Sequence, residues 1–293
     1  MGHPRRYSLD QPSHFPVPRT MTLPTEPCYD IVEHVTSKSD LYVLLFTSRI
    51  LRHSALRVLL RVIDMRPNDP HSSLNNLKPF VIQRFERINA SPSLALVVQK
   101  LIFYRHVIKD ELLHTILPLM TNIRHLCFAT PPHPIFFNFS LQLTSFEFLA
   151  DSHGRKRGAR KWINSHMTDF LNRQNDLTEL TILQPPKTEQ PLAHLSPNAM
   201  PHLDTLTFHV GPGLARILEG RGVKRLHTLH RAVFDVDAIP VESLKQIRVL
   251  VCNQILQTSP TRLYGLVNLV YLQTLYPFFF SFVRIASAFS SLK

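Results

Sequence analysis

The stretches LTELTI at 177–182 and LDTLTF at 203–208 contain the pattern that decides the fold. Each stretch follows the pattern apolar-x-x-apolar-x-apolar, in which x is any residue. The last two apolar positions lie two apart, so their side chains point to one face of a short strand. One such strand cannot bury its apolar face alone, and the pattern therefore predicts strands that stack on one another.

The same spacing recurs from Val98 onward. First positions are separated by as little as 20 residues (123 to 143) and as much as 34 (143 to 177), which brackets the period of about 20 to 29 that is typical of leucine-rich repeats. We therefore expect residues 98–275 to form an irregular leucine-rich-repeat solenoid with a curved parallel sheet. The copies are Val98/Leu101/Phe103, Ile123/Leu126/Phe128, Leu143/Phe146/Phe148, Leu177/Leu180/Ile182, Leu203/Leu206/Phe208 and Leu244/Ile247/Val249, with weaker ones at Val223/Leu226/Thr228 and Leu269/Leu272/Thr274.

A helical pattern precedes these repeats. Leu41, Leu44 and Leu45 recur at i, i+3 and i+4, and the stretch 55–60 repeats that spacing, so three short helices are expected between residues 23 and 65.

The remaining segments are assigned by composition. Residues 1–21 are polar and proline-rich, and read as a disordered lead. Residues 66–97 are expected to form a helical linker and cap. The apolar segment 276–293 is open to three interpretations, a terminal helix that covers the last repeat, the cut end of a longer chain or an off-frame extension.

The N-terminal segment resembles an F-box. The resemblance is carried by Leu23-Pro24-Thr25-Glu26, Ile31, Val35, Asp40-Leu41, the stretch 44–49 and the stretch 55–61, and the stretches 62–65 and 91–94 are similar to fungal F-box proteins with leucine-rich repeats. It implies an α + α/β fold class, with a three-helix F-box module at 23–65 followed by the solenoid.

The resemblance also implies a function and a set of contact residues. An F-box docks onto the Skp adaptor of a cullin-RING (SCF-type) ubiquitin ligase, while the repeats capture the target protein. Some of the corresponding positions must also form the core of the helices. The implied docking residues are Leu23, Pro24, Ile31, Val35, Leu41, Leu44 and Leu45.

The solenoid offers a second candidate site on its concave face. The residue between the last two apolar positions of each copy should point away from the core, where extended partners are usually bound. A shift of one residue would exchange the two faces. This row is Ile102, Cys127, Glu147, Thr181, Thr207, His227, Arg248 and Gln273, and target binding is expected for its last six members.

A net charge of +12 keeps nucleic-acid binding open as an alternative. Arg155, Lys156, Arg157, Arg160 and Lys161 form a basic run in the longest gap between repeats, and no acidic residue follows Glu242. The run reads either as a nucleic-acid or nuclear-import patch or as a solvated loop.

No enzyme class is indicated by the sequence. It has no phosphate-binding loop, no nucleophile elbow and no metal-ligand motif, so no cofactor or metal is expected. The widely spaced Cys28, Cys127 and Cys252 read as free thiols, and no signal peptide or membrane span is apparent, so an intracellular location is expected. Pro27, where F-box proteins commonly have an aliphatic residue, leaves open a repeat scaffold unconnected with ubiquitin.

Overall fold

The computed structural model divides the chain into two compact units, Met1–Leu56 and Arg57–Lys293. The helix α3 (Arg49–Arg61) contains the boundary between them. The structure describes residues 25–66, 74–104, 110–129, 134–149, 166–183, 192, 194–209, 213–229, 233–256 and 264–274. The lead at 1–21, the basic run at 155–161 and the tail at 276–293 lie outside these ranges.

The first unit contains α1 (Thr25–Glu33), α2 (Lys38–Leu44) and the first part of α3. The hydroxyl of Ser37 accepts a hydrogen bond from the backbone N–H of Asp40 at 3.3 Å, which caps α2. Ser48 does the same for the N–H of Leu51 at 3.2 Å, at the start of α3. The side chains buried in this unit include Cys28, Val32, Leu41 and Ala55.

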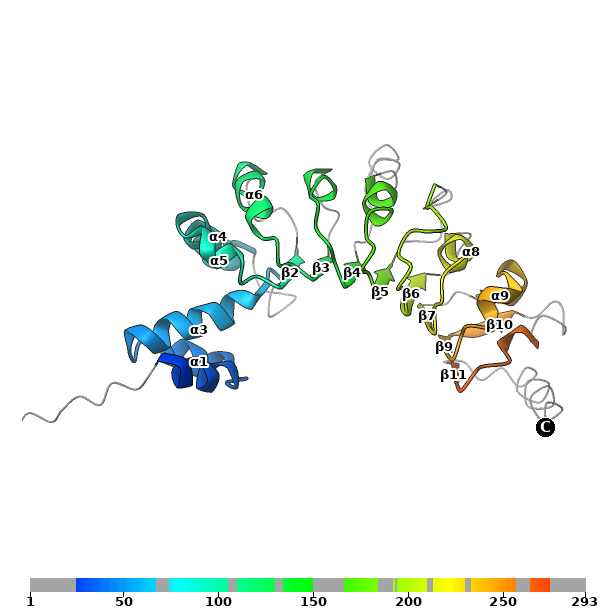
Figure 1. The fold of residues 1–293 in the computed structure, drawn as a ribbon, viewed down its shortest axis with the longest axis horizontal. Coiled ribbons are helices and arrows are strands. Elements are labelled where there is room, and N and C mark those ends of the chain that lie inside the picture. The colour runs from blue at the N-terminus through cyan, green and yellow to red at the C-terminus, as the bar shows by residue number, and fades with distance from the viewer. Residues whose placement is uncertain are drawn as a thin grey trace, which may run out of the picture. The chain divides into compact units, whose positions relative to one another are not determined.

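Within the described residues, the second unit is built on a nine-stranded, all-parallel sheet. Its neighbours follow chain order, except that β8 (Val233–Asp235) and β10 (Gln254–Leu256) leave it and pair with each other. Within this unit the sheet is curved, with its strands along the inner side (Figure 1). The strands are β1 (Val62–Asp64), β2 (Lys100–Phe103), β3 (His125–Phe128), β4 (Ser145–Phe148), β5 (Glu179–Ile182), β6 (Thr205–His209), β7 (Arg225–Leu229), β9 (Val249–Cys252) and β11 (Tyr271–Thr274).

Short helices return the chain from one strand to the next on the outer side of this sheet (Figure 1). Parallel strands require such crossovers, and the helices cover the apolar face of the strands. They are α4 (Leu74–Ala90), α5 (Pro92–Ala95), α6 (Asp110–Ile116), a helical segment at 166–171, α8 (Gly213–Leu218) and α9 (Val241–Leu244), with 3-10 turns at Leu117–Leu119, Pro134–Phe137, Val236–Ala238 and Tyr264–Leu266.

Phenylalanine rings fill the core between the middle strands and their covering segments. Phe128 of β3 has ring contacts with four others, the nearest being Phe136 at 5.2 Å between centroids in an edge-to-face arrangement. Phe146 of β4 meets Phe170 at 5.4 Å. Because Phe128, Phe146 and Phe170 are each fully buried, these rings tie neighbouring repeats into one core.

The expected fold class, a separate three-helix module followed by a solenoid, is wrong. The described residues form an α/β fold built on a nine-stranded parallel sheet, and this sheet begins at Val62, inside the segment assigned to the module. The reason lies in Leu60, Ile63 and Met65, which have the same spacing as the repeats and are at most 1% exposed. Leu60 also fits the helical periodicity of α3, so the helical interpretation concealed the strand that follows it.

The predicted position of the repeat near residue 247 is also wrong. Ile247, Leu250 and Cys252 occupy its three inward positions and are fully buried, not Leu244, Ile247 and Val249. Leu244 instead ends α9. Both positions of the repeat satisfy the apolar spacing. The two inward residues of the strand are Leu250 and Cys252 and not Ile247 and Val249, a shift of three residues. Because three is an odd number, the shift exchanges the two faces of the strand.

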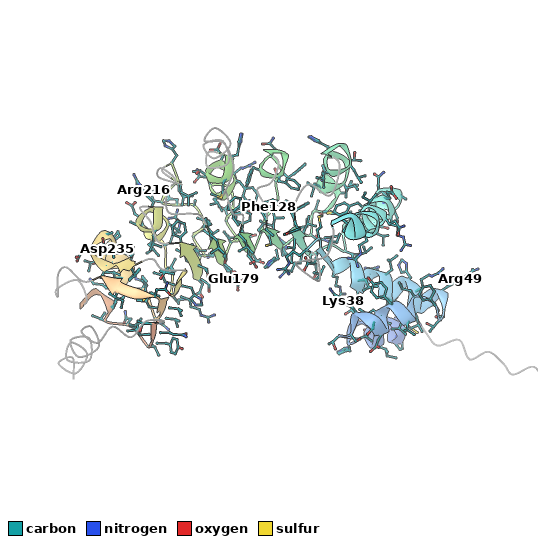
Figure 2. The ribbon with its side chains drawn as sticks, turned by 180° about the vertical axis from the view of Figure 1, so that it is seen from behind. Lys38, Arg49, Phe128, Glu179, Arg216 and Asp235 are labelled. Atoms are coloured by element: carbon teal, nitrogen blue, oxygen red, sulfur yellow. The ribbon has the colours of Figure 1, made fainter. Side chains whose placement is uncertain are left out.

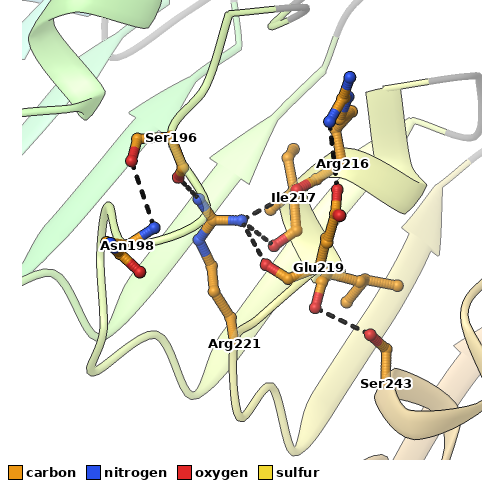
Figure 3. Close-up of polar contacts among 8 residues, drawn as sticks. Ser196, Asn198, Arg216, Ile217, Glu219, Arg221 and Ser243 are labelled. Atoms are coloured by element: carbon orange, nitrogen blue, oxygen red, sulfur yellow. Dashed lines mark hydrogen bonds and ion pairs between the residues drawn. The ribbon is translucent and has the colours of Figure 1, made fainter.

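Arg221 joins two successive repeats through backbone carbonyls (Figure 3). Its side chain, in a residue only 3% exposed, donates from Nε to the carbonyl of Ala199 at 2.7 Å and from Nη1 to that of Ile217 at 2.8 Å, and from Nη2 to that of Ser196. The Ile217 carbonyl belongs to the last turn of α8, where carbonyls lack partners within the helix. Ser243 adds a link to the following repeat, because its hydroxyl donates to the carbonyl of Leu218 at 2.9 Å.

Candidate functional site: the inner face of the parallel sheet

Two rows of side chains cover the inner face of the sheet in the second unit. The pairing register places one residue of every strand in each row. In Figure 2, Glu179 lies on this inner side and Phe128 on the side facing the helices. The first row is Val62, Lys100, His125, Ser145, Glu179, Thr205, Arg225, Val249 and Tyr271, and the second row is Asp64, Ile102, Cys127, Glu147, Thr181, Thr207, His227, Val251 and Gln273.

The second row contains most of the residues that the sequence placed on the concave face. The exception is Arg248, which lies one residue before β9, where it is exposed at the edge of the sheet, while Val251 pairs with His227 and Gln273 in the row. The members that lie as predicted are Ile102, Cys127, Glu147, Thr181, Thr207, His227 and Gln273.

The solvent exposure of the side chains changes along the second row. Ile102 and Cys127 are only 3% and 1% exposed although they lie on the inner face. From Glu147 onward the row is partly or fully exposed. A partner on this face would therefore reach the second-row side chains of β4 to β11.

The first row was missed by the sequence reasoning. Glu179 and Arg225 in this row are more exposed than their second-row neighbours Thr181 and His227. The signal was present, because side chains two apart on a strand share a face. Each second-row residue therefore implies a first-row partner two positions earlier.

Glu147 lies in close contact with His125 on the neighbouring strand. The distance from His125 Nε2 to Glu147 Oε1 is 2.9 Å, and both side chains are less than a third exposed. The hydrogen bond from His125 lowers the pKa of Glu147. Beside it, burial and the Glu147 charge raise the pKa of Cys127 to about 12, so that this thiol stays protonated and is a poor nucleophile.

The His125–Glu147 pair should make stability depend on pH. A carboxylate whose folded pKa lies below its ordinary value of 4.5 contributes stability above that value and loses it as the pH falls through the lowered pKa. We expect Glu147→Gln to lower the urea midpoint near neutral pH and to lower it less near about pH 3. An equal decrease at both pH values would contradict this assignment.

His227 lies at the accessible end of the second row. Its partial burial, and then the neighbouring Arg225 charge, lower the pKa of the imidazole. It therefore presents a neutral ring at neutral pH, which can both donate and accept a hydrogen bond.

The first unit carries a separate exposed apolar surface. Ile31 on α1 is 60% exposed, Val43 on α2 is 61% exposed, and Phe46 just after α2 is 82% exposed. Ile31 was expected from the sequence, whereas Val43 and Phe46 were missed because they fall outside the 41/44/45 periodicity. We name Ile31, Val43 and Phe46 the apolar helix surface.

The other implied docking residues are distributed differently. Leu41 is 4% exposed and belongs to the core of the first unit, so its side chain is not accessible to a partner. Val35, Leu44 and Leu45 are half-buried. Leu23 and Pro24 lie outside the described residues.

The described ranges contain no group of three or more His, Cys, Asp or Glu residues placed to hold a metal ion. In the same part of the chain, no helix has the length and apolar character needed to cross a membrane. Neither a protein-family model nor a curated protein matches the chain.

Proposed function

We propose that this chain is the substrate-recognition adaptor of an SCF-type ubiquitin ligase. Its N-terminal helices bind the Skp adaptor, and the inner face of its sheet binds the protein to be modified. The observation that carries this proposal is the apolar helix surface, in a segment whose sequence resembles an F-box. Each of these three residues keeps a large apolar side chain exposed, and a partner that covered them would remove that apolar area from water.

The mechanism of such an adaptor is to raise an effective concentration. Holding the target and the ligase core on one chain turns their encounter into an intramolecular event. The chain then needs no nucleophile or general base of its own, and the bond chemistry is done by other subunits. The high pKa of the Cys127 thiol is compatible with this role.

Co-purification with a Skp adaptor tests the docking half of the proposal. We expect Val43→Asp and Phe46→Asp together to abolish it, because each places a charge that would have to be desolvated in an apolar contact. Both residues are exposed, so the fold of the helices should survive. Circular dichroism would check this.

The matched control is Lys38→Asp, which puts the same side chain at an exposed position on α2. It lies in the first turn, where an acidic residue is favourable, and co-purification should remain unchanged. Failure of the wild-type chain to co-purify with the adaptor would refute the proposal. So would retention of the complex by the double variant.

A further inference from the structure

Three cationic residues lie at the end of the sheet at which β7 and β9 begin. Lys224 and Arg248 lie immediately before these strands and are neighbours, because the Arg248 N–H donates to the Lys224 carbonyl at 2.8 Å. Arg225 is the first residue of β7. Their side chains are well exposed, at 53% for Lys224 and 62% for Arg225, and Arg248 is exposed as well.

Only one carboxylate among the described residues pairs with these cations. Asp204 lies 3.0 Å from Lys224 Nζ and 3.9 Å from Arg225 Nε. The side chain of Arg248 has no hydrogen-bond or ion-pair partner in the described part of the chain. Three positive charges against one negative charge leave a local excess of two.

An exposed apolar patch adjoins the cations on the next strand. Val270 is 83% exposed and its N–H donates to the Arg248 carbonyl at 2.8 Å. Tyr271 is 51% exposed and pairs in register with Val249, the residue that also pairs with Arg225. Val267, three residues before Val270 in the chain, is 45% exposed.

We propose that this surface binds an acidic protein segment that carries one aliphatic or aromatic side chain. We name it the β7–β11 edge, made of Lys224, Arg225, Arg248, Val267, Val270 and Tyr271. The carboxylates of the segment meet the cations, and its apolar side chain covers Val270 and Tyr271. The inference rests on the proposed function in one respect, namely that the protein to which this segment belongs is a target of the ligase.

The same observations favour a protein segment over a nucleic acid. A nucleic acid gains affinity from many phosphate contacts, and three cations beside a carboxylate provide few. Of the three apolar residues of the edge, Tyr271 has an aromatic ring on which an unpaired base could stack, whereas Val267 and Val270 offer aliphatic surface.

A displayed library of random 12-residue peptides, selected on the full chain, tests this proposal. We expect enrichment of peptides with several Asp or Glu residues and one large apolar residue. Arg248→Glu should weaken the enriched peptides by about tenfold or more, because it replaces attraction with repulsion. Tyr271→Ser should weaken them without changing the dependence on salt.

Arg124→Glu is the matched control, since Arg124 is exposed and occupies the same position before β3. It should leave peptide affinity unchanged. Three results would each overturn the proposal. They are a selection that enriches no acidic peptides, an equal loss of peptide affinity in Arg248→Glu and Arg124→Glu, and a 12-nucleotide RNA probe that binds more tightly than the enriched peptides. Adaptor co-purification measured on the same variants separates the two ideas, because Arg248→Glu should not affect it.

Discussion

Replacing Phe128 with alanine is expected to lower the free energy of unfolding of the second unit by about 3–5 kcal/mol. Phe128 is fully buried, and its ring meets those of Phe103, Phe136, Phe137 and Phe146. Removing it leaves a cavity that several rigid rings border, so the site cannot collapse easily. These rings come from β2, β3, β4 and the Pro134–Phe137 turn, and the loss therefore weakens contacts between neighbouring repeats.

Urea unfolding followed by circular dichroism would measure this loss. A stack of repeats need not unfold in one step, so the m-value should be compared between variants as well as the midpoint. Phe46→Ala is the matched control, because the same atoms are removed from a side chain that is 82% exposed, and its effect should stay within about 0.5 kcal/mol. Equal effects of the two substitutions would contradict the account of the core.

Most strands could be predicted from the sequence because the repeat signature describes a physical necessity. An inward pair such as Leu206 and Phe208 must alternate with outward residues, and every inward pair needs a neighbour on which to stack. The signature predicted the strand position least well where two registers both fit the apolar spacing. Around Val249, four apolar residues in succession between Val249 and Cys252 allow more than one register, and only burial in the folded chain distinguishes them.

The candidate surfaces were less predictable than the strands. A pattern of apolar residues shows which side chains need burial, but it does not show which ones remain exposed. Leu41 and Phe46 look equally apolar in the sequence, yet one is 4% exposed and the other 82%. The β7–β11 edge was missed for a related reason, because Arg248 was placed within a strand and not at its start, beside Lys224.

Arg221 has a structural role that its charge alone would not suggest. Burial lowers the pKa of its guanidinium to about 10, which still leaves it protonated at neutral pH. All the donors of a charged guanidinium are therefore available to backbone carbonyls. The carbonyls that it reaches belong to the segment before α8, to α8 itself and to the turn after it (Figure 3).

Arg221→Ala is therefore expected to lower the free energy of unfolding by about 3 kcal/mol or more, because several buried carbonyls lose their donors at once. Arg221→Lys should recover part of this, since an ammonium can serve some of those carbonyls but cannot span them as the planar guanidinium does. Arg216→Ala is the control, because the side chain of Arg216 makes an exposed ion pair with Glu219 at 3.3 Å, which is worth at most about 1 kcal/mol. Equal shifts of the unfolding midpoint in Arg221→Ala and Arg216→Ala would show that the hydrogen bonds from Arg221 to these carbonyls do not hold the two repeats together.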